Sequence, residues 1–218
     1  MIEKIETIRK IQDNGIIAVI RNIPEDKISD LAEALISSGI NTLEITVEGE
    51  NGFSMIEFLS KKYKDQVLIG AGTVIDSASA QLAISKGANY ILSPNFNPEV
   101  VKTTLRYGKV VVPGVMTPTE MMNAMECGAD MVKIFPASVL GVKFIKDVKG
   151  PFPQIPIIPT GGIDVNNVGD FIKAGVEAVG VGGTLINKEA IQRSDFDSIK
   201  ETASQFISEI KKARGMSL

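Results

Sequence analysis

The chain has 218 residues, of which 44% are hydrophobic and 22% charged, with 23 basic against 26 acidic side chains and a formal net charge of −3. This length fits a single globular domain over residues 1–218, which would bury roughly 70–75% of the surface of the unfolded chain. The chain has no histidine, which excludes a Ser/His/Asp triad, a His-rich metal site and imidazole acid–base chemistry, and its single cysteine excludes a disulfide framework.

An amphipathic helix opens the chain, with Ile2, Ile5, Ile8 and Ile11 along one stripe. Eight short β-branched runs follow, in chain order residues 16–20, 43–47, 67–71, 90–92, 110–112, 131–135, 155–158 and 178–181. Five of these runs come shortly after a glycine that ends a helical stretch, and glycine suits the left-handed position just after a helix. Asn97-Pro98 and Thr117-Pro118 each place a cap before a first-turn proline, which marks the start of a helix.

This alternation of strand and helix predicts an α/β fold, a (β/α)8 TIM barrel preceded by an extra N-terminal helix. An open doubly wound sheet is the alternative, but it usually needs fewer strands. We expect the N-terminal helix to plug the bottom of the barrel.

Polar residues near the carboxyl ends of these strands should point into the mouth of the barrel, because side chains alternate across a strand. Lys133 stands between Val132 and Ile134, which suit the helix layer, so Lys133 should face inward. The same alternation sends Glu44 and Thr46 inward. The other inward residues are expected to be Ile17, Val19 and Arg21 on the first strand, Ile69, Ala71 and Thr73 on the third, and Ile158 and Thr160 on the seventh.

A buried lysine beside a buried glutamate has two interpretations. In the first, Lys133 and Glu44 fill the barrel as a structural ion pair. Alternatively, burial and a second nearby cation favour the neutral amine, which attacks a ketone, and the resulting protonated imine is an electron sink for C–C cleavage. Since the chain has no histidine and no cluster of metal ligands, Schiff-base chemistry is the strongest option that the remaining residues allow.

Glycine pairs follow the last two predicted strands. Gly161-Gly162 comes after the seventh run, and Gly182-Gly183-Thr184 comes after the eighth. A single glycine pair usually marks a tight turn. Two pairs at adjacent strand ends, with free backbone N–H groups and a helix N-terminus behind them, favour a phosphate site.

Six motifs together resemble the 2-keto-3-deoxy-6-phosphogluconate (KDPG) and 4-hydroxy-2-oxoglutarate aldolase family. In chain order these are Glu44-Ile45-Thr46, Gly70-Ala71-Gly72-Thr73-Val74, Ser93-Pro94, Val132-Lys133-Ile134-Phe135-Pro136-Ala137, Pro159-Thr160-Gly161-Gly162-Ile163 and Gly182-Gly183. The resemblance covers nearly the whole chain. It implies a homotrimeric (β/α)8 barrel that reversibly splits KDPG into pyruvate and glyceraldehyde 3-phosphate, and some members also cleave 4-hydroxy-2-oxoglutarate to pyruvate and glyoxylate.

The resemblance also implies a role for each site residue. Lys133 would form the imine with the C2 keto group, and Glu44 would be the general acid and base, acting through a water. Thr73 would hold the pyruvate carboxylate, Pro94 and Phe135 would shape its pocket, and Thr160 would lie beside the substrate. The phosphate would be received by Gly161, Gly162, Gly182, Gly183 and Thr184. We expect no metal and no cofactor.

One position departs from the family pattern. Well-known members carry a carboxylate-binding arginine four residues after the strand-two glutamate, where this chain has Glu48. Arg21 resembles an arginine of the galactonate branch and could replace it, with Glu48 outside the pocket or against a hydroxyl. The substrate therefore stays open between KDPG, its galactonate epimer and 2-keto-4-hydroxyglutarate.

Two further classes and the partners complete the expectations. A phosphosugar isomerase or epimerase, or a non-catalytic phosphate-binding barrel, would use the same fold. The basic clusters at residues 61–64 and 211–214 sit in helical patterns beside acids and indicate solvated helix faces, not a nucleic-acid patch. No apolar run approaches the ~20 residues of a membrane span, so we expect a small-molecule substrate, no membrane partner and a cytoplasmic location.

Overall fold

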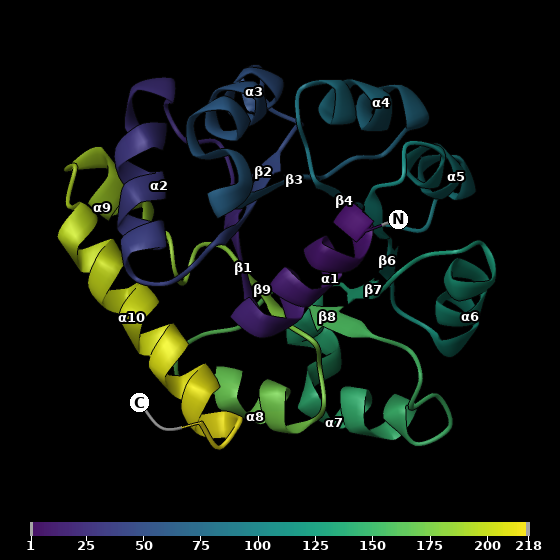
Figure 1. The fold of residues 1–218 in the computed structure, drawn as a ribbon. Coiled ribbons are helices and arrows are strands. Elements are labelled where there is room, and N and C mark those ends of the chain that lie inside the picture. The colour runs from purple at the N-terminus through teal and green to yellow at the C-terminus, as the bar shows by residue number, and fades with distance from the viewer. Residues whose placement is uncertain (1, 217–218) are drawn as a thin grey trace.

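A computed structural model describes residues 2–216 as an α/β protein in which helices surround a curled parallel sheet (Figure 1). The strands are β1 (Ile16–Ile20), β2 (Thr42–Thr46), β3 (Leu68–Gly72), β4 (Tyr90–Leu92), β5 (Val110–Val112), β6 (Gly114–Val115), β7 (Val132–Ile134), β8 (Ile157–Pro159) and β9 (Val179–Val181). The helices are α1 (Ile2–Asn14), α2 (Ile28–Ser37), α3 (Gly52–Tyr63), α4 (Ser77–Ser85), α5 (Pro98–Arg106), α6 (Pro118–Glu126), α7 (Ala137–Lys149), α8 (Val168–Lys173), α9 (Lys188–Gln192) and α10 (Phe196–Ala213), with 3-10 turns at Glu25–Lys27 and Lys64–Gln66.

All the paired strands are parallel, and they form two sheets. One sheet has six strands in the order β5-β4-β3-β2-β1-β9, and the other has three in the order β6-β7-β8. The expected fifth strand is β5, and a further short strand, β6, follows it after Pro113, which has no N–H to donate to a ladder. A single bridge between Thr160 and Gly180 joins the other edges of the two sheets.

The strands separate two apolar layers. Alternate residues such as Ile45, Val132 and Ile134 pack outward against the helices, in the large cluster that holds most of the buried core. The smaller inner cluster contains Ile17, Tyr90, Leu92, Val110, Val112, Met131 and Ile158, among others. The inward positions expected for Ile17 and Ile158 are therefore confirmed.

The prediction of which β3 side chains face the interior is wrong. Ile69 and Ala71 pack outward in the helix-facing cluster, whereas Leu68 belongs to the inner cluster. Gly70 and Gly72, which share the inward face with Leu68, have no side chain and so give no hydrophobic signal in the sequence. A side-chain carbon on either glycine would collide with an interior residue of a neighbouring strand, since the two positions meet Tyr90 and Glu44.

Helix α1 crosses the end of the sheet in front of the strands (Figure 1), as expected of a plug. Ile11 is fully buried in the inner cluster and Ile8 packs against it. The other half of the predicted stripe is not buried, because Ile2 and Ile5 are 75% and 46% exposed. Ion pairs from Lys4 to Asp130 and from Glu3 to Lys109 hold this end of α1 instead.

The expected helix starts are present. Asn97 accepts a hydrogen bond from the N–H of Glu99 at the start of α5, and Thr117 forms a complete capping box with Glu120 at the start of α6.

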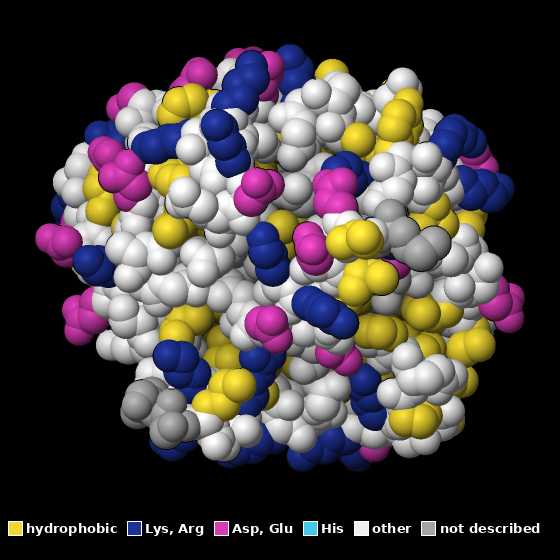
Figure 2. All heavy atoms as spheres, viewed as in Figure 1, with side chains coloured by type: hydrophobic (Ala, Val, Ile, Leu, Met, Phe, Trp, Pro, Cys, Tyr) yellow, Lys and Arg dark blue, Asp and Glu magenta, His cyan; other side chains and the backbone are white. Residues whose placement is uncertain are grey.

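Positive and negative side chains are interspersed over the face that α1 covers (Figure 2). Among residues 2–216, no helix is both long enough and apolar enough to cross a membrane.

Candidate active site

Lys133 and Glu44 form the charged centre of the interior. Lys133 lies in β7 and Glu44 in β2, and Nζ of the lysine is 3.7 Å from Oε1 of the glutamate. The two side chains are only 6% and 0% exposed. Within the described residues, neither carboxylate oxygen of Glu44 has a hydrogen-bond partner. A structural ion pair in a protein interior normally has its oxygens satisfied, so this pair retains acceptors for a substrate or a water.

Gly72 makes the space that Glu44 occupies. A side-chain carbon at Gly72 would lie 2.5 Å from Cδ and 2.6 Å from Cγ of Glu44, and closer still to Oε1. Any other residue at this position would therefore displace the carboxylate from its present position. The glycine at the end of β3 is a requirement of the site.

Tyr90 fills the interior beside Glu44. Its hydroxyl donates to the carbonyl of Leu43 at 2.9 Å, one residue before Glu44 in β2. Its ring packs where Gly70 has no side chain, since a carbon there would lie 2.5 Å from Cδ2 of the ring. Complete burial, and secondarily the negative charge of Glu44, raise the pKa of Tyr90 well above the ordinary value of 10.

Phe135 lies beside the lysine, and Thr160 follows the neighbouring strand β8 and lines the same pocket as Phe135. The ring centroid of Phe135 is 5.3 Å from Nζ of Lys133, which places a cation over an aromatic face. Thr160 is 7% exposed and its hydroxyl oxygen is buried with no hydrogen-bond partner in the described residues. Its side chain occupies the space above Gly180, where a side-chain carbon would lie 3.0 Å from Cγ2 of the threonine.

Arg21 joins two further residues at the rim. Its Nη2 donates to the hydroxyl of Thr73 at 3.1 Å, and its Nη1 is 3.2 Å from Oε1 of Glu48. Thr73 follows β3 directly with a left-handed backbone (φ = 60°), which turns the chain out of the strand. Glu48 was expected outside the pocket or against a hydroxyl, and it instead forms an ion pair with Arg21.

A pocket of about 430 Å³ connects Arg21, Phe135 and Thr160 to the glycine pairs. Its lining contains Val19, Arg21, Phe135, Thr160, Gly161, Gly162, Ile163, Gly180, Gly182, Gly183 and Thr184. Gly161 and Gly162 both have left-handed φ values, of 100° and 72°. Within residues 2–216, the N–H groups of Gly162, Gly183 and Thr184 have no acceptor, so these three remain available to an anion.

Two details of this pocket differ from the expectation. The helices do not begin directly behind the glycine pairs, because α8 starts at Val168 and α9 at Lys188. The hydroxyl of Thr184 donates to the carbonyl of Ile163 at 2.5 Å and so ties the two loops together. Backbone N–H groups, more than helix ends or the Thr184 hydroxyl, are therefore the available donors.

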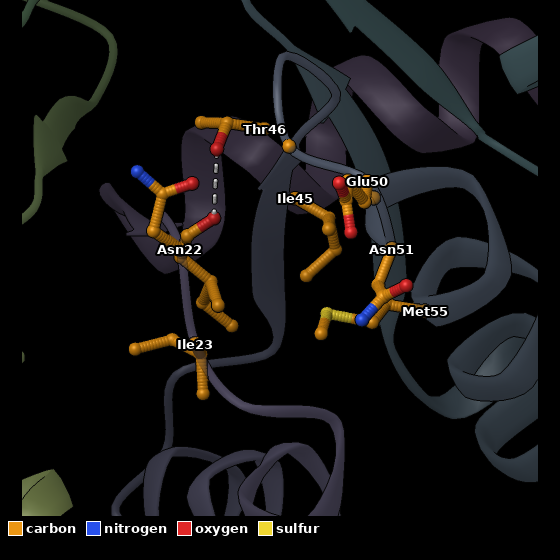
Figure 3. A pocket seen from close by; sticks show the side chains of 10 residues that line it. Asn22, Ile23, Ile45, Thr46, Glu50, Asn51 and Met55 are labelled. Carbon is orange, nitrogen blue, oxygen red and sulfur yellow. Dashed lines mark hydrogen bonds between the residues drawn. The ribbon is translucent and has the colours of Figure 1, made fainter.

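Pro94 borders a second pocket, of about 410 Å³, on the other side of Phe135. That pocket is also lined by Asn95, Phe96, Gly114, Val115, Met116 and Glu120. A third pocket, of about 210 Å³, lies behind the rim between the ends of β1 and β2. Figure 3 shows its lining, including Glu50 and Asn51, and the hydrogen bond of 3.4 Å from the Thr46 hydroxyl to the Ile20 carbonyl.

The structure thus brings most of the predicted site residues together, around two neighbouring centres. Glu44 and Phe135 lie beside the Lys133 amine. Arg21, Phe135, Thr160 and the glycine pairs line the neighbouring pocket, and Thr73 is hydrogen-bonded to Arg21. Sequence reasoning missed Tyr90 and Gly72. The signal for both was present in the spacing of Gly70 and Gly72, which leaves the inward face of one strand without side chains.

Comparisons with known proteins identify the relatives of this chain. The family model described as KDPG and KHG aldolase matches residues 7–202. The 2-dehydro-3-deoxy-phosphogluconate aldolase of Haemophilus influenzae is 36% identical over 94% of this chain and 97% of its own length. The 2-dehydro-3-deoxy-6-phosphogalactonate aldolase of Escherichia coli is 32% identical over 91% of this chain and 94% of its own length.

Solved structures match as well. The crystal structure of KDPG aldolase from Legionella pneumophila, with pyruvate captured as a covalent carbinolamine intermediate, superposes with a TM-score of 0.85 and 30% identity, over 90% of this chain and 96% of that one. Fold and relatives define the class of the protein: it is an aldolase, a lyase of carbon–carbon bonds. More narrowly, the chain belongs to the KDPG and KHG aldolase family.

Proposed function

We propose that this protein is a Schiff-base aldolase that reversibly cleaves 2-keto-3-deoxy-6-phosphogluconate into pyruvate and glyceraldehyde 3-phosphate. One observation carries the proposal: a buried amine lies 3.7 Å from a buried carboxylate whose oxygens have no hydrogen-bond donor in the described part of the chain. A pair that served only to fill the interior would leave a large desolvation cost unrelieved. A bound keto acid or water relieves it.

The chemistry follows from the two groups. The amine of Lys133 adds to the C2 carbonyl of the keto acid, and loss of water gives a protonated imine. A base removes the proton of the C4 hydroxyl, the C3–C4 bond breaks, its electron pair moves toward the imine nitrogen to give an enamine, and the aldehyde leaves. Protonation of the enamine at C3 and hydrolysis of the imine release pyruvate and restore Lys133. Glu44 is the titratable group beside these atoms, and we assign it the proton transfers, through a water.

The remaining residues position the substrate. Arg21 and Thr73 are joined by a hydrogen bond and present a guanidinium and a hydroxyl to the carboxylate. Phe135 and Pro94 shape the space around the pyruvyl group. The free N–H groups of the glycine pairs receive the phosphate, whose binding energy orients the chain for cleavage.

Borohydride trapping tests the proposal. Incubation with pyruvate, followed by reduction and mass spectrometry, should give a stable adduct on Lys133, and EDTA should leave both trapping and turnover unchanged. Lys133→Arg keeps the charge and should give neither an adduct nor turnover. An isomerase, an epimerase or a passive phosphate-binding protein would give no adduct, and normal turnover by Lys133→Arg would refute the assignment.

Arg21→Ala tests the carboxylate site separately. Because the guanidinium would be lost while Lys133 is untouched, the KM for pyruvate in the condensation direction should rise about tenfold or more, at a cost of about 1.4 kcal/mol. An unchanged KM would remove Arg21 from the site.

The galactonate epimer is the second candidate substrate. Arg21 resembles the arginine of that branch, and a relative named for the galactonate substrate is 32% identical to this chain. Thr160 would present to the substrate a buried hydroxyl that has no hydrogen-bond partner among residues 2–216. Comparison of kcat/KM for the two epimeric phosphorylated sugar acids and for 2-keto-4-hydroxyglutarate decides between the three, since only the last lacks the phosphate.

Three broader features belong to the same proposal. The two sheets would form one closed (β/α)8 barrel and a single domain over residues 1–218, which the Thr160–Gly180 bridge and the continuity of β5 and β6 through Pro113 support. The enzyme would be a homotrimer, with exposed apolar side chains such as Val139 (71%) and Ile75 (57%) available to interfaces, and light scattering should give three times the mass of one chain. We assign it to the cytoplasm, where a lone Cys127 stays reduced.

A further inference from the structure

The guanidinium of Arg21, at the rim of the pocket, is paired with the carboxylate of Glu48. Its side chain is 54% exposed, and the guanidinium has two partners in the described residues, Glu48 through Nη1 and the Thr73 hydroxyl through Nη2. Thr73 is neutral, so Glu48 alone balances the charge. The cation that we assign to the substrate carboxylate is therefore already paired.

Glu48 is not required to hold the loop in place. Its side chain is 31% exposed, and Arg21 is its one ion-pair partner in residues 2–216. An ion pair this exposed contributes between about 0 and 1 kcal/mol, because water solvates both partners well when they separate. An incoming carboxylate can thus exchange with Glu48 at little cost, but it cannot bind Arg21 without either displacing this carboxylate or lying close to it.

We propose that Glu48 is a resident competitor of the substrate: it occupies Arg21 in the free enzyme, the carboxylate of the 2-keto acid takes its place on binding, and Glu48 thereby sets the affinity of the site for keto acids. The inference rests on the proposed function, because it takes the Arg21–Thr73 end of the pocket as the carboxylate site. It assigns to Glu48 a specificity role and no part in the bond-breaking steps.

Competition and a positioning role predict opposite effects of removing Glu48 on the affinity for keto acids. If Glu48 only oriented Arg21 toward the pocket, its removal would weaken keto-acid binding. Because Glu48 competes for the same guanidinium, Glu48→Gln, which keeps the size and removes the charge, should strengthen binding. The expected gain is about threefold to fivefold, the worth of one exposed ion pair.

Salt dependence gives a second readout. Binding to the wild-type enzyme exchanges one ion pair for another, so the affinity for pyruvate should change little with ionic strength. Binding to the Glu48→Gln variant creates a new ion pair, and its affinity should fall toward the wild-type value as salt screens the interaction.

The experiment measures the pyruvate concentration that gives half-maximal borohydride trapping of Lys133 at low and high salt. Five proteins are compared: wild type, Glu48→Gln, Glu50→Gln, Arg21→Ala and the double variant Arg21→Ala/Glu48→Gln. Glu50 is the matched control, because it lies two residues further along the same loop, has no ion-pair partner in the described residues and lines the separate pocket of Figure 3. Glu50→Gln should therefore leave the half-saturation concentration unchanged.

The outcomes separate the inference from the function on which it rests. Absence of an adduct on Lys133 in the wild type would refute the aldolase mechanism itself. If the adduct forms but Glu48→Gln leaves the half-saturating pyruvate concentration unchanged or raises it, the competition alone is overturned. The same holds if Glu48→Gln lowers that concentration equally in the Arg21→Ala background, or if Glu50→Gln lowers it equally. If Glu48→Gln instead strengthens competition by inorganic phosphate and not pyruvate binding, Arg21 serves the phosphate and the inference is wrong.

Discussion

Gly72→Ala tests the geometry of the site with a single methyl group. The added carbon would lie 2.5 Å from Cδ and 2.6 Å from Cγ of Glu44. Ordinary contacts between such atoms are about 3.5–4.0 Å, so the carboxylate must retreat by about 1 Å or more. Glu44 is fully buried and belongs to the middle of a parallel strand, so the carboxylate has to leave the position in which it lies 3.7 Å from Lys133 Nζ.

The displacement predicts the size of the effect. A misplacement of about 1 Å in a catalytic group costs on the order of 10²-fold in rate, and overpacking an interior costs about 1–3 kcal/mol of stability. Gly72→Ala should therefore fold with a lower melting temperature and lose about two orders of magnitude in kcat. Imine formation should be affected less than cleavage, because Lys133 itself is not touched.

The assay follows pyruvate release with lactate dehydrogenase and NADH, beside borohydride trapping and thermal unfolding of the same preparations. Gly70→Ala is the matched control, because it overpacks the interior against Tyr90 and leaves the Gly72 side of Glu44 free. Gly72→Ala with kcat within twofold of wild type, in a protein that is measurably destabilised, would refute the view that the carboxylate must stay where Gly72 allows it.

Three other predictions concern single groups. Lys133→Met should abolish turnover and also reduce the free energy of unfolding by about 3–5 kcal/mol at neutral pH, measured in urea, because it leaves the Glu44 charge buried without its partner. Thr160→Val should change kcat/KM for the sugar acid with stability within about 0.5 kcal/mol of wild type, since the hydroxyl has no partner to lose in the described residues; a large loss of stability would contradict this. The pKa of Tyr90 is raised, so this phenol stays protonated in the folded protein at a pH where it ionises in the unfolded chain. The free energy of unfolding should therefore fall as the pH rises past about 10. Because Tyr90 does not ionise in the folded protein, the ultraviolet titration curve of folded Tyr90→Phe should match that of the folded wild type.

The chemistry of the site could be predicted from the sequence because it uses residues that are rare in such surroundings. A lysine between valine and isoleucine, and a glutamate between leucine and isoleucine, break an apolar pattern in one place each, and alternation then assigns their direction. Both are buried and face each other. The caps at Asn97 and Thr117 were equally readable, because capping depends on residues within three positions.

Other features were not predictable because they depend on groups that are distant in sequence or that have no side chain. The phase of β3 is set by Gly70 and Gly72, and a hydrophobic pattern cannot register a glycine, so Ile69 and Ala71 were assigned to the wrong face. The ion pair of Arg21 with Glu48 joins loops that follow different strands. The exposure of Ile2 and Ile5 follows from the short span over which α1 meets the interior, which a helical periodicity does not reveal.

The same arrangement of a glycine beside a larger side chain occurs three times in the interior. Gly70, Gly72 and Gly180 each lack a side chain where a neighbouring strand presents a large or polar one: Tyr90, Glu44 and Thr160 respectively. Two of these three side chains have buried oxygens without partners in the described residues, and each such group costs about 1–3 kcal/mol. The helix-facing cluster, which is apolar and holds most of the buried residues, offsets that cost. Stability and reactivity are therefore carried by opposite faces of the same strands, so substitutions that fill the space at Gly72 or Gly180 should impair catalysis more than folding.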